Sequence, residues 1–336
     1  MKTKITYFIL FLLLLCFNIK AQTTRDSLVY TPIKVTTQVK HDTSYMVTTQ
    51  TTHDTSWTTI KVDTIKIPIN TSDSYVINSM YVSPIEDWIA SPDMYLSWAK
   101  NNGVNELNLY ARAYITSSSK NATLAAFIKK AKEQYGIKKV FVDYRLTSEI
   151  PAWQTYVNKY KGTTSNVDGM ITEREPYVTG DYAGFWPFLQ QGKAFTKANN
   201  LMLAVYMGHP TQQGWDSICY YSDRVYLSLY ITMTTWNNST NGYNYAAGRW
   251  GYISNSCTKF GKKDFPVIYI MSLEKTSWGA GNEFMGSWYI NNPFYGSTWN
   301  ILLSQYNKNA TTAIKSATEL VGECIFYSKY ARLAKP

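Results

Sequence analysis

Two carboxylates stand two residues apart in the stretch 168–177, whose sequence is DGMITEREPY. Read as a β-strand, this stretch alternates its side chains between two faces, so Ile171, Glu173 and Glu175 share one face. Pro176 lacks a backbone N–H group and ends the strand just past the second carboxylate. Two acids at the mouth of a strand are typical of acid/base chemistry on a glycosidic bond.

The rest of the chain repeats one unit: an apolar strand, polar residues at its end, and an amphipathic helix. We expect strands over residues 75–82, 106–114, 139–146, 168–175, 201–207, 224–231, 266–273 and 323–330. The helices expected between them span residues 92–102, 122–135, 150–160, 185–198, 215–221 and 297–320. One more helix is expected to end at about residue 260.

Eight strands that alternate with helices predict a (β/α)8 TIM barrel over residues 72–336, since that fold takes about 250 residues. The alternative is an open, doubly wound α/β sheet. It is disfavoured because no glycine-rich phosphate loop follows the first expected strand.

The first 21 residues have the features of a secretory signal peptide. Lys2 and Lys4 precede an apolar stretch over residues 7–17, and Ala21 offers a cleavage point. The apolar stretch is too short to span a membrane comfortably. We therefore expect a secreted, periplasmic or cell-surface protein with no transmembrane span in the mature chain.

Residues 22–71 are rich in Thr, Val, Lys, Asp and Ser, and the sequence HDTS at 41–44 returns at 53–56. The alternation of β-branched and polar residues predicts an extended conformation. The segment has too few apolar residues to fold alone, so we expect a stalk or linker. Such a stalk offers a means of association with a cell surface.

The chain has a formal net charge of +10, of which the three lysines of the signal segment account for three, so the mature chain carries +7. No run of Lys and Arg marks a nucleic-acid site, and we expect no nucleic-acid partner. Cys219, Cys257 and Cys324 allow either one disulfide and a free thiol or three buried thiols. They form no CxxC or Cys/His cluster, so a structural metal site is not expected.

In a barrel of this kind the active site lies at the C-terminal ends of the strands. That rule selects polar residues at the ends of the expected strands, namely Arg112, Asp143, Arg145, Glu173, Glu175, His209, Tyr230 and Glu274. Each alone is explained as well by solvation or ion pairing, whereas several acids beside aromatic residues are typical of a site. Trp236, Trp278 and Trp288 lie in or beside Gly- and Asn-rich stretches, where loop packing or a carbohydrate cleft explains them.

The sequence DGMITERE at 168–175 resembles the fourth-strand signature DGxDxDxE of glycoside hydrolase family 18, the chitinases and endo-β-N-acetylglucosaminidases. Asp168 and Gly169 match its opening. Glu175 matches its terminal Glu, so the resemblance implies that Glu175 is the general acid.

Three positions depart from the pattern of that family. Glu173 stands where the family has the Asp that orients the substrate acetamide, and Ile171 stands where it has another Asp. Ile231 follows Tyr230, where the family has a Tyr-Asp pair. In the family the acetamide oxygen is the nucleophile and the inward Asp residues balance the charge of the intermediate. The departures imply a distant or degenerate relative.

A second catalytic scheme uses a different carboxylate. Many retaining barrel glycosidases carry the acid/base on strand four and the nucleophile on strand seven, where Glu274 stands. Glu173 or Glu175 would then be the acid/base, and Arg112 or Arg145 would hold the nucleophile ionised. The Asn that usually precedes such an acid/base is absent.

The sequence therefore predicts a secreted glycoside hydrolase-like barrel that cleaves a β-linked poly- or oligosaccharide. Glu175 is expected to be the general acid, with Glu173 or Glu274 as its carboxylate partner, and no cofactor is needed. The residues expected to contact substrate are Arg112, Asp143, Arg145, His209, Tyr230, Trp236, Trp278 and Trp288. The alternative is a non-catalytic glycan-binding or cell-surface protein on a degenerate glycosidase barrel.

Overall fold

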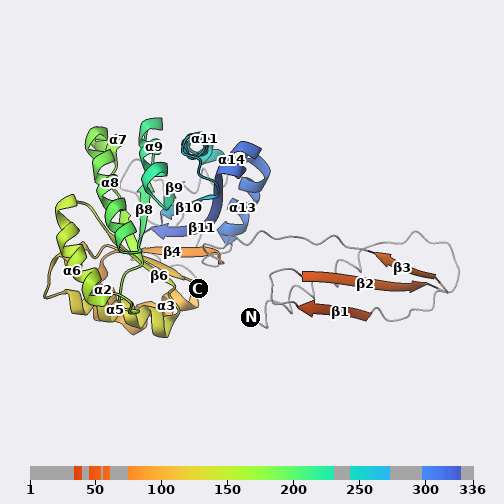
Figure 1. Ribbon diagram of the computed structural model, residues 1–336. Coiled ribbons are helices and arrows are strands. Elements are labelled where there is room, and N and C mark those ends of the chain that lie inside the picture. The colour runs from red at the N-terminus through yellow and green to blue at the C-terminus, as the bar shows by residue number, and fades with distance from the viewer. Residues whose placement is uncertain are drawn as a thin grey trace, which may run out of the picture. The chain divides into compact units, whose positions relative to one another are not determined.

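The computed structural model describes residues 34–39, 45–53, 56–60, 75–230, 243–272 and 297–326. The chain divides into two compact units, Met1–Ser74 and Tyr75–Pro336 (Figure 1). In the first unit, β1 (Lys34–Val39), β2 (Tyr45–His53) and β3 (Ser56–Ile60) form an antiparallel sheet in the order β1-β2-β3. These strands are extended, as the alternation predicts. The stalk role and the domain limits stay predictions, and the signal segment lies outside the described residues.

The second unit contains a closed barrel of parallel strands, which confirms the expected (β/α)8 fold. The strands follow one another around the barrel in chain order, and the last pairs with the first. They are β4 (Ile77–Val82), β5 (Glu106–Leu109), β6 (Lys139–Asp143), β7 (Gly169–Thr172), β8 (Met202–Met207), β9 (Arg224–Ser228), β10 (Phe265–Ser272) and β11 (Thr318–Phe326).

Helices lie outside the strands of the barrel (Figure 1). They are α2 (Ile85–Ala90), α3 (Pro92–Asn101), α4 (Arg112–Thr116), α5 (Asn121–Tyr135), α6 (Ile150–Tyr160), α7 (Pro176–Thr179), α8 (Tyr182–Ala198), α9 (Gln212–Tyr221), α11 (Tyr243–Lys259), α13 (Ser297–Asn309) and α14 (Thr312–Ala317), with a 3-10 turn at Thr147–Glu149. Among the described residues, none of these helices is long and apolar enough to cross a membrane.

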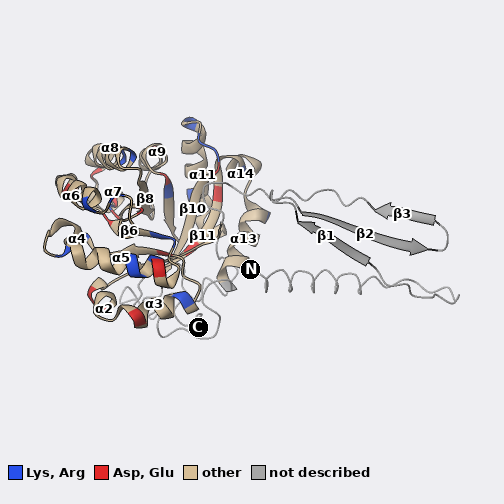
Figure 2. Ribbon diagram, turned by 60° about the horizontal axis from the view of Figure 1, so that its bottom comes forward, with Lys and Arg blue, Asp and Glu red and all other residues tan. Residues whose placement is uncertain are grey.

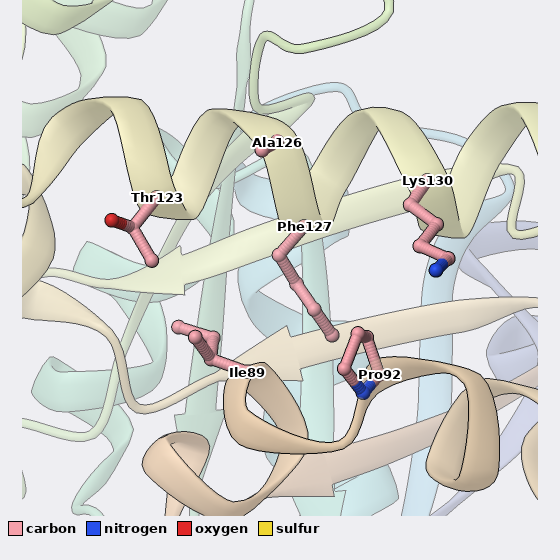
Figure 3. A pocket seen from close by; sticks show the side chains of 6 residues that line it. All are labelled: Ile89, Pro92, Thr123, Ala126, Phe127 and Lys130. Atoms are coloured by element: carbon pink, nitrogen blue, oxygen red, sulfur yellow. The ribbon is translucent and has the colours of Figure 1, made fainter.

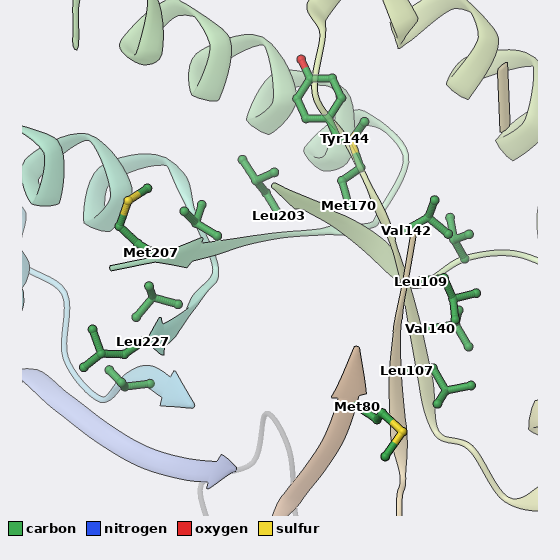
Figure 4. Close-up of a cluster of buried hydrophobic side chains, with 14 of the residues drawn as sticks. Met80, Leu107, Leu109, Val140, Val142, Tyr144, Met170, Leu203, Met207 and Leu227 are labelled. Atoms are coloured by element: carbon green, nitrogen blue, oxygen red, sulfur yellow. The ribbon is translucent and has the colours of Figure 1, made fainter. Parts of the chain in front are cut away.

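The strands separate two apolar layers. Side chains that point outward, such as Met80, Leu107 and Val142, pack between the strands and the helices (Figure 4). Side chains that point inward, such as Tyr81 and Phe141, fill the barrel itself. Successive residues of a strand therefore belong to different layers, as the period of two requires.

The second expected strand was too long, because β5 ends at Leu109 and Arg112 begins helix α4. Arg112 is therefore not a strand residue. Asp143, at the end of β6, explains the change: its Oδ1 accepts a hydrogen bond of 2.8 Å from the backbone N–H of Arg112. A carboxylate at the first turn of a helix satisfies a donor that has no partner within the helix.

The eighth expected strand was displaced, because β11 spans Thr318–Phe326 and the helical region ends at Ala317 instead of residue 320. The Thr318 hydroxyl donates a 2.7 Å hydrogen bond to the carbonyl of Ile314 at the end of α14. Gly322 allows a close approach to β4, since an added Cβ atom would lie 2.1 Å from the carbonyl oxygen of Ile77. Helix α2 was not predicted from the sequence.

Cys219, Cys257 and Cys324 are all buried and unbridged. Of the two arrangements left open by the sequence, the structure has three buried thiols.

A buried ion pair crosses the barrel interior between the first residues of β5 and β9. Arg224 Nη2 lies 2.8 Å from Glu106 Oε2, and both side chains are 0% exposed. The Tyr75 hydroxyl donates a 2.6 Å hydrogen bond to Glu106 Oε1. The guanidinium carbon of Arg224 lies 4.2 Å from the centre of the Phe141 ring. Each charge thus has its partner inside the barrel, which buried charges require.

We expect Glu106→Gln to destabilise the protein by about 3–5 kcal/mol, because the variant leaves the charge of Arg224 buried without its carboxylate. Urea unfolding followed by circular dichroism measures the change. Lys130→Met is the matched control, since Lys130 pairs at 2.6 Å with Asp93 on the surface, and this variant should unfold near the wild-type midpoint. Equal midpoints for the two variants would contradict the importance of the buried pair.

Candidate active site

Glu173 directly follows β7 and points into the barrel on the same side as Ile171. Its Oε2 accepts a hydrogen bond from the hydroxyl of Tyr110. Its Oε1 is buried and has no hydrogen-bond partner among the described residues. The pKa of Glu173 is raised to about 7, chiefly by burial, and the nearby carboxylates of Asp143 and Glu175 add to the rise. The hydrogen bond from Tyr110 and the charge of Arg145 oppose it. Glu173 therefore holds a proton at a pH where an ordinary Glu does not.

Glu175 lies two residues further, where Pro176 begins α7. Burial raises the pKa of Glu175, and a hydrogen bond from the hydroxyl of Tyr177 opposes the rise. The charge of Glu175 is one of the causes that raise the pKa of Glu173. The expected strand over 168–175 was too long, because β7 ends at Thr172 and both acids follow it. The two carboxyl groups still face one region of the barrel mouth, since each raises the pKa of Tyr206.

Asp143 positions both candidate arginines. Besides the backbone of Arg112, it binds the Nε of Arg145 through Oδ2 at 3.1 Å. Burial raises the pKa of Asp143, and these hydrogen bonds and charges oppose the rise. The guanidinium carbon of Arg145 lies 5.6 Å from the centre of the Tyr110 ring. Arg112 instead directs its Nε toward Glu149 Oε1 at 3.2 Å. Arg145 therefore lies nearer to the Tyr110–Glu173 pair, and Arg112 lies outside it.

Aromatic rings lie beside the two acids at the C-terminal end of the barrel. The Tyr81 ring lies 5.6 Å from that of Tyr110 and 6.2 Å from that of Tyr206, centre to centre. The Tyr230 ring lies 6.4 Å from Tyr206 and 5.9 Å from Phe326. Burial raises the pKa of Tyr206, and the carboxylates of the two glutamates add to the rise. These rings and the acids therefore form one cluster.

His209 lies two residues past β8, beside the second acid. Its ring is perpendicular to the Tyr177 ring at 6.4 Å. Burial lowers the pKa of His209, and the charge of Arg249 lowers it further. His209 is therefore neutral at neutral pH. A neutral imidazole can donate one hydrogen bond and accept another.

The structure thus brings together Asp143, Arg145, Glu173, Glu175, His209 and Tyr230 at the C-terminal ends of the strands, with Arg112 at their edge. Glu274, Trp236, Trp278 and Trp288 lie outside the described residues, and their roles stay predictions.

Tyr110, Tyr177 and Tyr206 belong to this cluster, and the sequence analysis did not single them out. Tyr110 and Tyr206 each follow an inward residue, Asn108 or Ala204, by two positions. The period of two that located the acids would have located these residues as well, had it been continued along every strand.

A cavity of about 360 Å³ lies in the outer helical layer (Figure 3). It is lined by Ile89, Pro92, Thr123, Ala126, Phe127 and Lys130, from α2, α3 and α5. It contains none of the candidate site residues. Within the described part of the chain, no group of three His, Cys, Asp or Glu residues is arranged to hold a metal ion.

The chain was compared with family models, curated proteins and solved structures. No family model matches the chain, and no curated protein matches it. A similar solved structure is a Rhizomucor miehei beta-1,3-glucanosyltransferase, an active-site mutant in complex with laminaritriose, with 13% identity and a TM-score of 0.47 over 76% of this chain and 89% of that one.

Chitinase-like barrels are also among the similar structures. A chitinase from Chromobacterium violaceum shares 14% identity over 59% of this chain and 68% of that one, with a TM-score of 0.35. A chitinase-like agglutinin from Robinia pseudoacacia shares 10% identity over 76% and 96%, with a TM-score of 0.38. At such values the likeness carries no argument about function, which rests on the residues of the site.

We expect Glu173→Gln to stabilise the protein above pH 7 by about 3 kcal/mol. Unfolded Glu titrates near pH 4.5, whereas folded Glu173 titrates at about 7. Between these values the folded protein retains a proton that the unfolded chain has released, so the wild type loses stability as pH rises, and the loss levels off above pH 7. Urea unfolding of both proteins from pH 4 to 8 should show the gap opening with pH. A difference in unfolding free energy that does not change with pH would contradict the raised pKa of Glu173.

Tyr110→Phe should raise the pKa of Glu173 above that in the wild type, because the hydroxyl of Tyr110 stabilises the ionised carboxylate. Carboxyl carbon NMR titration measures the pKa directly. Tyr135→Phe is the matched control, since the Tyr135 hydroxyl bonds Asp93 on the surface, and it should leave Glu173 unchanged. A lower pKa in Tyr110→Phe would contradict the assigned hydrogen bond.

Proposed function

We propose that this protein is a secreted glycoside hydrolase that cleaves a β-linked glycan by carboxylate acid/base catalysis. One observation carries the proposal: Glu173 and Glu175 face one region of the barrel mouth, and burial raises the pKa of Glu173 to about 7. Glycoside cleavage needs one carboxyl group that holds a proton and one that is ionised. Two acids in different environments meet that need.

The environments favour Glu173 as the proton donor. Glu173 is the more deeply buried of the two acids, and at neutral pH a large fraction of it is protonated. Its unpartnered Oε1 offers a position for a substrate oxygen. Glu175, which accepts a hydrogen bond from Tyr177, then acts as the ionised partner. This assignment reverses the roles that the family resemblance implies, and Glu274 stays a candidate partner from the sequence.

The aromatic cluster supports a sugar as the substrate. Tyr206 and Tyr230 place their rings beside the acids, and sugar rings stack on such faces. Association with a cell surface through residues 22–71 is part of the proposal and rests on the sequence alone.

A glycan-binding protein without turnover is the second candidate. Ile171 favours it, because this fully buried residue occupies the inward position where the resembling family carries an Asp. A barrel that lost this charge would still hold a sugar through its tyrosines and arginines.

The test is an assay of the mature chain against chitin oligomers, N-glycans and β-1,3-glucan oligomers. Glu173→Gln and Glu175→Gln should each lower turnover by about 10²–10⁴-fold while ligand binding persists. Glu133→Gln is the matched control, since Glu133 bonds Thr164 on the surface. If Glu173 is the acid, turnover in the wild type should fall as pH rises through about 7.

Cleavage that survives both substitutions would overturn the proposal. Binding of a glycan by the wild type and both variants, with no cleavage by any of them, would establish the second candidate.

A further inference from the structure

Arg249, on α11, lies at the C-terminal ends of two barrel strands and is 6% exposed. Its Nη1 donates hydrogen bonds to the carbonyl oxygens of Ser228, the last residue of β9, and of Gly208, which follows β8; the second bond measures 3.5 Å. The helix thereby brings a cation to the same end of the barrel as the two candidate acids.

The strand end that Arg249 contacts borders the Glu175–Tyr177 pair. A Cβ atom added to Gly208 would lie 2.3 Å from the Tyr177 hydroxyl oxygen and 3.7 Å from Glu175 Oε1. Burial and the charge of Arg249 together lower the pKa of the neighbouring His209. The ring of Tyr245 lies 5.3 Å from the guanidinium carbon. Arg249 is therefore a neighbour of the proposed site, and an aromatic ring packs against its guanidinium group.

Arg249 has no carboxylate partner among the described residues, and its Nη2 is buried without a hydrogen-bond partner there. Arg224, the other buried arginine discussed above, has Glu106 at 2.8 Å. A guanidinium group stays charged in proteins, and a buried charge without a counter-ion is costly. The carbonyl groups at the ends of β8 and β9 take up Nη1. The N–H groups of Nη2 have no acceptor among the described residues.

We propose that Arg249 binds an oxyanion carried by the glycan, either the carboxylate of a uronic acid or a sulfate ester. Arginine suits such groups because its fork of N–H donors matches their oxygens. This inference names the substrate class of the proposed function and rests on it, in that Arg249 and the two acids belong to one site. The net charge of +7 in the mature chain also favours acidic glycans.

The experiment compares glucose, glucuronate and glucose 6-sulfate as ligands of the mature chain at matched ionic strength. Binding is followed by thermal shift and by NMR of the arginine guanidinium groups. Arg249→Gln should weaken binding of the charged sugar on the order of tenfold or more, and leave glucose unaffected. Arg174→Gln is the matched control, because Arg174 pairs with Asp181 outside the cluster, and it should bind as the wild type does.

Preference for glucuronate over the sulfate identifies a uronic acid, and the reverse identifies a sulfate ester. Equal affinity of the wild type for glucose and both charged sugars overturns the proposal. Should Arg249→Gln fail to fold, the wild type decides: a guanidinium resonance must shift with a charged sugar and not with glucose.

The two proposals fail separately. Cleavage of neutral glycans by a protein that shows no preference for charged sugars keeps the hydrolase and removes the role of Arg249. Binding of glucuronate through Arg249 without cleavage of any glycan keeps the role of Arg249 and removes the hydrolase.

Discussion

Closing the barrel removes its inward-facing side chains from water, so every polar group there must find its partner inside. At the starts of β5 and β9 this requirement is met for Glu106, which pairs with Arg224 and accepts a hydrogen bond from Tyr75. At the opposite end it is met only in part. Glu173 has one oxygen bound by Tyr110 and one without a partner, and the Nη2 of Arg249 is likewise without one. Glu173 and Arg249 lie at the end of the barrel at which ligands bind in barrels of this kind.

The barrel could be predicted because its signal is periodic and repeated. The limits of α6 are those expected, and the inward orientation of Ile171 followed from the period of two alone. The errors lie where contacts between distant segments override local preference. Asp143 binds the backbone N–H of Arg112, where a helix begins in place of the expected strand. Strand β11 begins at Thr318, before the expected start at residue 323.

The site was predicted less completely than the fold. Acids at a strand end are visible in a sequence, whereas the burial that shifts their pKa depends on neighbours from other strands. Tyr110 stands 63 positions from Glu173, and no local pattern links the two. Arg249 reaches the site from a helix, so a rule that considers strand ends alone misses it. Charge was equally uninformative: in the view of Figure 2, basic and acidic residues are spread over several helices of the barrel unit.

The seam between β11 and β4 joins the last strand of the barrel to its first. A chain that has been synthesised only as far as α14 has every other strand but cannot close, because Thr318–Phe326 is missing. Until that segment arrives, β4 and β10 are open edges with unpaired backbone groups, which invite pairing with other chains. Because contacts so distant along the chain form slowly, the barrel completes its fold only after synthesis of its final strand.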